Sequence, residues 1–314
     1  MDPLLDIIRL LQPRATLFGA GFDACGQWGL SFRKRDDLLF CWVERGECLL
    51  LRDHHAPLTL RQGDFALIFT ATPFTLASDV SALAVDSEGA VAATRSDWLA
   101  LGTGAERPVT LRAGKFQVAA THRDLLASLV PPLVHLESGD ASLGRVHALL
   151  AMNEHEAREP GPASDFVVER LVELILVEIL RTRRMRAGER AAGLLAGLAD
   201  PVTARALAAI HRDVAHGWTL DELARLCAVS RSAFAARFRA VVGAAPISYL
   251  LHWRMALAKD ALSRGDRRID EIAFAIGFQS ASAFTTAFTR AVGCSPRRFA
   301  NRHGRGASGA AARA

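Results

Sequence analysis

The sequence has no uncharged apolar run near the ~20 residues that a membrane-spanning helix requires. Its longest apolar stretch, residues 171–180, is interrupted by Glu173 and Glu178. The first residues, MDPLLDIIRLL, carry acidic groups where a secretory signal carries lysine or arginine. These absences argue against a membrane partner and against secretion, and we expect a cytoplasmic protein.

The sequence also lacks any regular spacing of metal ligands. It has five cysteines, an odd number, which favours free thiols in a reducing compartment. His54 and His55 are adjacent, so on a strand they would point to opposite faces. Asp53 and Pro57 beside them favour an exposed hairpin turn instead. We therefore expect no metal, no cofactor and no catalytic residues.

Net positive charge is missing from the first two thirds of the chain. Residues 1–199 hold 21 Lys+Arg against 25 Asp+Glu, whereas residues 200–314 hold 17 against 8. The overall charge of +5 therefore comes from the C-terminal segment, as phosphate binding on DNA requires. The 314 residues are enough for two domains, each with its own core.

Within the basic segment, residues 219–238 and 268–288 follow the same pattern. Each predicts a short amphipathic helix, a tight turn, and a second helix that begins after a serine, Ser230 or Ser280. Thr219, with Glu222 three residues on, forms a capping box before the first of these helices. The pattern is that of a helix-turn-helix, whose second helix enters a DNA groove.

The duplicated pattern resembles the AraC/XylS family of bacterial transcription regulators over about residues 200–300. The second copy carries the residues of that resemblance: Ile272, Ala273, Gly277, Phe278, Ser280, Phe284, Phe288, Gly293, Ser295 and Pro296. Between the copies, Gly243, Pro246, Tyr249, Arg254 and Ala258 match the connecting helix of the family. The resemblance implies a C-terminal all-α domain with two helix-turn-helix motifs at residues 200–301.

The expected DNA contacts lie opposite the buried phenylalanines of each second helix. Phe234 and Phe238, and in the second copy Phe284 and Phe288, are spaced to face the core. The resemblance then assigns groove contact to Arg231, Ser232, Ala235, Ala236 and Arg239, and in the second copy to Ser280, Ala281, Ser282, Thr286, Thr289 and Arg290. Alanines cannot hydrogen-bond base edges, although they can contact a thymine methyl group. We expect Arg231, Arg237 or Arg239 to contact phosphate or one guanine.

Residues 246–263 predict the helix that joins the two motifs. About 18 residues at ~1.5 Å each give a rod of about 27 Å, close to the ~34 Å between successive major grooves on one face of DNA. Arg254, on this helix, matches an arginine of the family and favours a structural contact over a base contact.

Short apolar runs separated by Gly, Asp and Pro fill residues 17–120, as is typical of an antiparallel β-barrel or a jelly roll. The pattern around Gly46, Gly63-Asp64 and Pro73 resembles the first half of a cupin barrel, of the sensor type found before AraC-type DNA-binding domains. The resemblance implies an N-terminal cupin-like domain with added helices at residues 1–190. Cys41, Phe74 and Ala113 stand where this sensor type often has His, His and Cys, which puts a bound metal in doubt.

Three helices are expected at residues 122–130, 142–159 and 164–186. The last has too many apolar faces for a lone surface helix. It favours a homodimer formed through this helix, and the alternative is burial within its own domain. Residues 187–200 are interpreted as a linker, and residues 302–314 as a disordered tail.

These observations predict a sequence-specific transcription regulator that binds double-stranded DNA under the control of a small-molecule effector. The aromatic residues expected around that effector are Trp28, Phe40, Trp42, Phe69 and Phe74, with core packing as the alternative. The family favours activation, which would make RNA polymerase a partner. Two other hypotheses remain open: a thiol redox sensor using Cys25, which lies before Trp28, and a metal-dependent cupin enzyme fused to a DNA-binding module.

Overall fold

The computed structural model describes residues 2–18, 21–35, 38–69, 72–94, 98–103, 106, 108–122, 125–126, 132–140, 143–159, 161–186 and 193–304. The chain packs into two compact units. The strand-rich unit comprises residues 13–118 and 130–182, and the helical unit comprises residues 1–12, 119–129 and 183–314. The expected domains, 1–190 and 200–301, are continuous along the chain, whereas packing assembles the helical unit from three separate segments.

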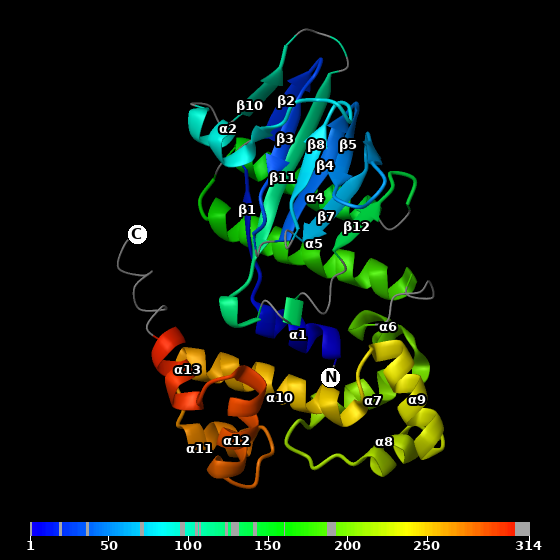
Figure 1. Cartoon of the computed structure of the whole chain (residues 1–314), viewed down its shortest axis with the longest axis vertical. Coiled ribbons are helices and arrows are strands. Elements are labelled where there is room, and N and C mark those ends of the chain that lie inside the picture. The colour runs from blue at the N-terminus through cyan, green and yellow to red at the C-terminus, as the bar shows by residue number, and fades with distance from the viewer. Residues whose placement is uncertain are drawn as a thin grey trace. The chain divides into compact units, whose positions relative to one another are not determined.

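Two β-sheets form the strand-rich unit, as the cupin resemblance implies (Figure 1). The seven-stranded sheet has the order β10-β2-β11-β4-β7-β12, with β1 also paired to β11, and the five-stranded sheet has the order β6-β5-β8-β3-β9. Only the pairs β10·β2 and β3·β9 are parallel among the described strands. The strands are β1 (Arg14–Leu17), β2 (Gly21–Cys25), β3 (Gly29–Phe32), β4 (Leu38–Arg45), β5 (Glu47–Arg52), β6 (Leu58–Arg61), β7 (Phe65–Phe69), β8 (Phe74–Ala77), β9 (Val85–Asp86), β10 (Trp98–Gly102), β11 (Val109–Gln117) and β12 (Leu133–Leu136).

Strand alternation divides the apolar residues of this unit between two faces. On β4, Leu39, Cys41 and Val43 join the core between the sheets. Phe40 faces the other way and packs against Phe65 and Phe116, at ring-centroid distances of 6.1 and 4.9 Å. The seven-stranded sheet is therefore apolar on both faces.

The turn expected at Gly63-Asp64 is present and is held by the buried Asp64 carboxylate. Gly63 has φ of +86°, a conformation that glycine adopts without steric cost. Asp64 accepts hydrogen bonds from the backbone amides of Arg61 and Ser138, and lies 2.9 Å from Nε2 of His135. Burial alone would raise the pKa of Asp64, but these hydrogen bonds outweigh it and lower that pKa.

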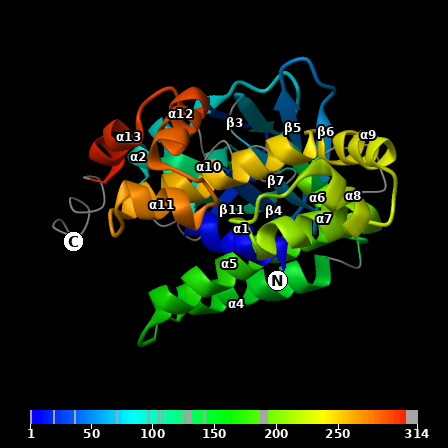
Figure 2. The same ribbon diagram turned by 90° about the horizontal axis from the view of Figure 1, so that it is seen from below.

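Helices α2 (Ser87–Ala93), α4 (Leu143–Arg158) and α5 (Ser164–Arg186) accompany the sheets, and the last two confirm helices expected from sequence. α4 and α5 lie side by side (Figure 2). α5 buries Leu171, Ile175 and Ile179, yet leaves Phe166 and Leu174 exposed. The helix thus has both a packed face and an apolar solvent face.

The helical unit begins with the first helix of the chain and continues beyond residue 183. The structure places a helix, α6, where a linker was expected, because Leu194, Leu195 and Leu198 are buried in this unit. The helix expected at residues 122–130 begins as a 3-10 turn, η1, and residues 123–124 and 127–130 lie outside the described part. The helices are α1 (Pro3–Leu11), η1 (Ala120–His122), α6 (Leu194–Ala199), α7 (Pro201–Arg212), α8 (Leu220–Leu226), α9 (Arg231–Val242), α10 (Pro246–Arg264), α11 (Ile269–Ala275), α12 (Ala281–Val292) and α13 (Pro296–His303).

The predicted tail at residues 302–314 overlaps the end of α13, and residues 305–314 lie outside the described residues. Within the described part, no single helix combines the length and hydropathy needed to cross a membrane. The pair α9 and α10 meets that test together, with a bend of 50° between them.

Candidate nucleic-acid interface

The first helix-turn-helix motif consists of α8 and α9, and both predicted caps are present. The Thr219 hydroxyl accepts a hydrogen bond from the Glu222 amide at 3.2 Å, while the Glu222 carboxylate accepts from the Thr219 amide at 2.9 Å. Ser230 caps α9 by accepting from the Ala233 amide at 3.3 Å. Each cap satisfies an N–H group that would otherwise lack an intrahelical partner, which fixes where each helix begins.

The second motif, α11 and α12, repeats this arrangement with different turn chemistry. Ser280 caps α12 by accepting from the Ala283 amide at 3.1 Å. The turn before it contains Gly277 with φ of +86°, whereas the first motif has Ala228 with φ of +56° in its turn. The same left-handed turn is therefore made by two different residues.

The paired phenylalanines of both recognition helices are fully buried, as the sequence predicts. Phe234 and Phe238 lie with ring centroids 5.6 Å apart, and Phe284 and Phe288 lie 5.5 Å apart. Because the pairs are four residues apart on a helix, they fix which face of α9 and of α12 is left in solvent.

The predicted contact residues of α9 lie mainly on its solvent face. Arg231, Ser232, Ala236 and Arg239 are exposed, and Ala235 is half-buried. Nη1 of Arg231 lies 3.1 Å from a carboxylate oxygen of Asp221 on α8. Among the described residues, Arg239 has no acidic partner.

Arg237 differs from these two arginines, because it is bound within the unit. Its guanidinium donates hydrogen bonds from Nε and Nη2 to the Asp200 carboxylate, with Nε at 3.0 Å from Oδ2. Asp200 in turn caps α7 by accepting from the Val202 and Thr203 amides. Of the three arginines expected to contact DNA from this helix, Arg237 thus has a structural role.

On α12, Ser282, Thr286, Thr289 and Arg290 are exposed, while Ala281 and Ser280 are half-buried. Two serines and one threonine already make local hydrogen bonds. The Ser280 and Ser282 hydroxyls are 3.0 Å apart, and the Thr289 hydroxyl donates to the Thr285 carbonyl at 2.7 Å. In the part of the chain that the structure describes, Arg290 has no acidic partner and is the longest side chain on this face.

The two motifs lie at opposite ends of α10 (Figures 1 and 2). This helix has 19 residues, one more than expected, which gives a length of about 28 Å at ~1.5 Å per residue. Its buried Leu250 and Trp253 lie toward one end, and Leu262 toward the other. One continuous helix therefore sets the spacing of α9 and α12.

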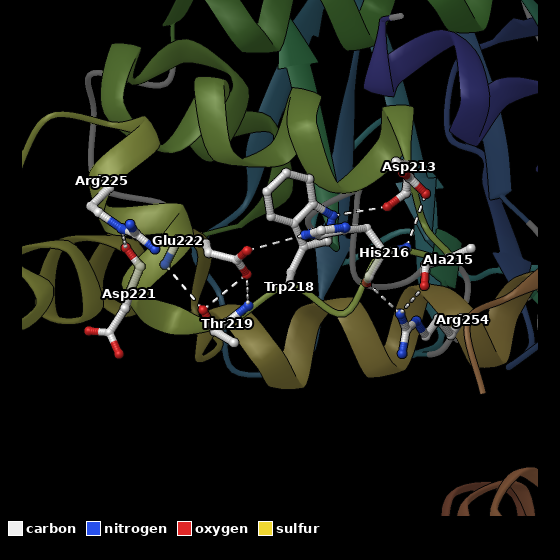
Figure 3. Close-up of polar contacts among 9 residues, drawn as sticks. All are labelled: Asp213, Ala215, His216, Trp218, Thr219, Asp221, Glu222, Arg225 and Arg254. Carbon is white, nitrogen blue, oxygen red and sulfur yellow. Dashed lines mark hydrogen bonds and ion pairs between the residues drawn. The ribbon is translucent and has the colours of Figure 1, made fainter. Parts of the chain in front are cut away.

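Arg254 of α10 makes the structural contact that the sequence predicts, and Figure 3 draws its hydrogen bonds to Ala215 and His216. Its guanidinium donates to the carbonyl oxygen of Val214 at 2.8 and 3.0 Å, and to that of His216 at 2.9 Å. Gly277 packs against this site, since a Cβ there would lie 2.4 Å from the Ala215 carbonyl oxygen. A residue from the second motif and one from the rod thus hold the segment that leads into the first motif.

Two further contacts, also visible in Figure 3, hold residues 213–219, the segment between α7 and α8. The indole N–H of Trp218 donates to the Asp213 carbonyl at 2.9 Å. Nε2 of His216 lies 3.4 Å from the Glu222 carboxylate, which belongs to the capping box of α8. Hydrogen bonds from Thr219 hold the pKa of Glu222 below its usual value.

The strand-rich unit holds a cavity of about 310 Å³, bordered by β2, β3, β4, β10, β11 and α2. None of the five aromatic residues expected around an effector lines it. Trp28 and Phe74 do not line the cavity but pack against residues that do. The ring centroids of Trp28 and Phe22 are 5.8 Å apart, and those of Phe74 and Phe32 are 4.5 Å apart. Phe40, Trp42 and Phe69 belong to the opposite face of their strands, which strand alternation requires.

The structure separates the cysteines of this unit. Cys41 and Cys48 are buried in the core between the sheets, and burial raises the pKa of Cys41 to about 12 and that of Cys48 further still. Such thiols are protonated at neutral pH and react slowly. Cys25, at the end of β2, is half-buried.

His54 and His55 lie in an exposed turn between β5 and β6, as the sequence predicts. Among the residues described, no three His, Cys, Asp or Glu side chains are grouped as a metal site requires.

Known proteins and protein families match most of the chain. A cupin family matches residues 2–183, and a helix-turn-helix domain family matches residues 223–302. A putative AraC-like transcription regulator of Streptomyces antibioticus is 40% identical over 297 residues, which is 94% of this chain and 97% of that protein. A second, from Streptomyces lividans, is 38% identical with the same coverage. The crystallised DNA-binding domain of AdpA, in complex with a target DNA, is 31% identical, with a TM-score of 0.31 over 33% of this chain and 92% of its own.

Proposed function

Because the chain belongs to the AraC-like family of transcription regulators, with a cupin domain before a helix-turn-helix domain, we propose that α9 and α12 enter two successive major-groove segments of one DNA duplex. The protein is a DNA-binding regulator and not an enzyme, in keeping with its relatives.

The observation that carries this proposal is the pair of serine-capped helices at the two ends of α10. Both helices bury two phenylalanines and leave the opposite face in solvent. A rod of about 28 Å between them, together with the width of the helices, suits the ~34 Å repeat of the major groove. A single protein chain can therefore bind two groove segments without a second subunit.

The side chains on the two faces support different kinds of contact. Arg239 and Arg290 can each bind a phosphate or the O6 and N7 atoms of a guanine. Thr286 has a methyl group and a hydroxyl for a base edge, and Ala235 and Ala236 offer methyl contact to thymine. We therefore assign specificity mainly to α12, with α9 adding one arginine and apolar contact.

A footprint of the full chain on a selected genomic fragment tests this arrangement. We expect two protected major-groove segments whose centres are about 10–10.5 base pairs apart on one face of the duplex. A single protected segment, or equal affinity for selected and random duplexes at physiological salt, would contradict it. Measuring the affinity at several salt concentrations separates the phosphate contribution from the base contribution.

We further propose that a small-molecule effector in the strand-rich unit controls this binding and that the protein activates transcription. Activation requires contact with RNA polymerase, so purified polymerase and the full chain on one promoter fragment provide the test. A transcript level that rises with added protein supports activation, and one that falls identifies a repressor.

A homodimer through α5 is the third part of the proposal. Phe166 and Leu174 are 61% and 49% exposed, although both are large apolar residues. Arg170, on the same helix, lies with its guanidinium carbon 5.3 Å from the centre of the Phe166 ring. Residues 166, 170 and 174 are four apart, so Arg170 lies between the two apolar residues on one exposed face of α5. Aromatic and arginine side chains are enriched at protein interfaces.

A further inference from the structure

The cavity of the strand-rich unit is lined by residues of both sheets and of α2. Figure 1 shows α2 beside the strands. The cavity wall is mainly aromatic and aliphatic, from Phe18, Phe22, Phe32, Leu39 and Leu99. Its volume of about 310 Å³ is at the lower end of the ~300–1,000 Å³ typical of small-molecule sites. The cavity therefore suits a compact, mostly apolar molecule.

One buried polar group on the wall, the Ser87 hydroxyl, has no hydrogen-bond partner among the described residues. Ser87, the first residue of α2, is only 6% exposed, and its hydroxyl makes no hydrogen bond with any described residue. Buried hydroxyls without a partner are costly and uncommon. A hydroxyl can donate one hydrogen bond and accept others. Ser87 can therefore donate to a ligand carbonyl oxygen or accept from a ligand hydroxyl.

The charged groups at the cavity are already paired with each other. Nη2 of Arg35 lies 2.6 Å from the Glu88 carboxylate, and both residues line the cavity. A second ion pair, from Nε of Arg33 to Asp86 at 2.9 Å, joins the same two segments. Asp86 also caps α2 by accepting from the Gly89 amide. These two pairs hold α2 to the residues that follow β3.

We propose that the effector of this cavity is a neutral, compact, largely aromatic molecule with a single hydroxyl or carbonyl oxygen, which hydrogen-bonds to Ser87. This inference rests on the effector control proposed above and names the chemical class of the ligand. The aromatic wall packs on the body of the ligand, and Ser87 fixes its orientation.

A carboxylate ligand fits this site poorly because Arg35 is already neutralised. The carboxylate would have to displace Glu88 from Arg35 or share the arginine with it, and two carboxylates at one cation repel each other. Its remaining charge would also lose hydration against an apolar wall. Neutral ligands incur neither cost.

Three probes with one shared ring system test the proposal: 2-naphthol, naphthalene and 2-naphthoate. Calorimetric titration of the full chain without DNA should give 2-naphthol the highest affinity and 2-naphthoate the lowest. Ser87→Ala should lower the affinity for 2-naphthol about five- to tenfold, because one hydrogen bond is lost. The affinity for naphthalene should stay within twofold of its original value. Ser81→Ala, which removes an exposed serine hydroxyl bonded to Asp79, is the matched control and should change neither.

A charge variant provides an independent readout. Glu88→Gln leaves Arg35 without its carboxylate partner, so 2-naphthoate should bind at least tenfold more tightly while 2-naphthol stays within twofold. Glu47→Gln, which removes the exposed carboxylate near Arg61 on the same sheet, should leave all three probes unchanged. Tighter binding of 2-naphthoate than of 2-naphthol by the unmodified protein would overturn the proposal.

The effect of 2-naphthol on DNA affinity distinguishes the two proposals. A change of threefold or more supports the cavity as the effector site. If the probes bind in the expected order and DNA affinity is unchanged, effector control through this site is contradicted while the chemistry of the site stands. If DNA binds and no probe does, the cavity inference is overturned and the DNA-binding proposal is unaffected.

Discussion

At the scale of single residues, the arginines of the two recognition helices fall into distinct classes. Arg237 is bound to Asp200, and Arg231 lies near Asp221. Arg239 and Arg290 have no acidic partner among the described residues. The sequence shows four similar exposed arginines, and only the packing of α7 against α9 distinguishes Arg237. A local signal was present in Asp200-Pro201, which is a typical helix start, but the contact itself spans 37 residues.

Arg290→Ala provides the test of base contact from α12. If Arg290 binds one guanine by two hydrogen bonds, the variant should lose about 1–3 kcal/mol of binding free energy and relax specificity at one base pair. Fluorescence anisotropy with single-base-pair variants of the selected site measures this. A uniform loss on every duplex would identify a phosphate contact instead. Arg205→Ala, an exposed arginine on α7, controls for the change in net charge.

His211 gives the helical unit a dependence on pH. Its side chain is fully buried, stacks on Trp253 at 4.4 Å, and has Nε2 2.7 Å from the Tyr249 hydroxyl. Burial lowers the pKa of His211 to about 4. The unfolded chain, with a pKa of about 6.5, therefore takes up a proton first as the pH falls. The free energy of unfolding should be constant above about pH 6.5 and fall between about pH 6.5 and 4.

The expected loss at pH 4.5 is about 1–3 kcal/mol. Asp6, whose carboxylate lies 3.4 Å from Nδ1 of His211, offsets part of this loss. Burial raises the pKa of Asp6, so as the pH falls the folded protein binds a proton at Asp6 before the unfolded chain does. Urea unfolding at several pH values, followed by tryptophan fluorescence, measures the loss. His211→Gln should flatten the curve in this window, and an unchanged slope in that variant would contradict the assignment.

At the scale of secondary-structure elements, short-range patterns predicted the motif well. The caps at Thr219, Ser230 and Ser280 and the buried phenylalanine pairs depend on residues three or four positions apart, which a sequence displays directly. α6 was missed because the segment that contains it, residues 187–200, is rich in Ala and Gly, as a linker often is. The cavity residues were missed because Ser87 and Arg35 come together only through the pairing of β3 with β9.

The two turns at Gly265 and Gly277 allow a matched comparison. Both glycines have positive φ, +70° and +86°. A Cβ at Gly265 meets nothing within 4 Å, whereas one at Gly277 would collide with the Ala215 carbonyl oxygen and with Arg254. Gly265→Ala should cost only the conformational penalty, about 1 kcal/mol, and Gly277→Ala should cost clearly more.

Urea unfolding of the two full-length variants measures this difference. Gly277→Ala should also weaken DNA binding, because the displaced segment leads into the capping box of α8. Equal stability of the two variants would show that the segment moves aside at little cost and that Arg254 does not hold it firmly.

At the scale of the whole molecule, the exposed stripe on α5 predicts the state of association. Replacing Phe166 and Leu174 together by Glu places two charges in the proposed interface, where uncompensated charge is strongly unfavourable. The variant should sediment as a monomer at concentrations where the unmodified chain sediments as a dimer. Leu83→Glu, at a site that is 92% exposed outside α5, should leave the dimer intact. If the unmodified chain sediments as a monomer, the proposed homodimer through α5 is contradicted.

The overall division of the molecule was predictable because the two halves differ in charge and in periodicity. The assignment of residues 3–11 to the helical unit was not predictable, because nothing in their sequence indicates which surface their apolar face will cover. In the structure, α1 buries Leu4, Ile7 and Leu11 in the helical unit, next to α7.

This route has a consequence for synthesis on the ribosome. Helix α1 is translated before its partner α7, which is added only after about 190 further residues; at ~5–20 residues per second this takes roughly 10–40 s. During that interval α7 is not there to cover its apolar face. A nascent chain halted before α7 should therefore expose α1 to proteases and chaperones, and release of the finished chain should protect it.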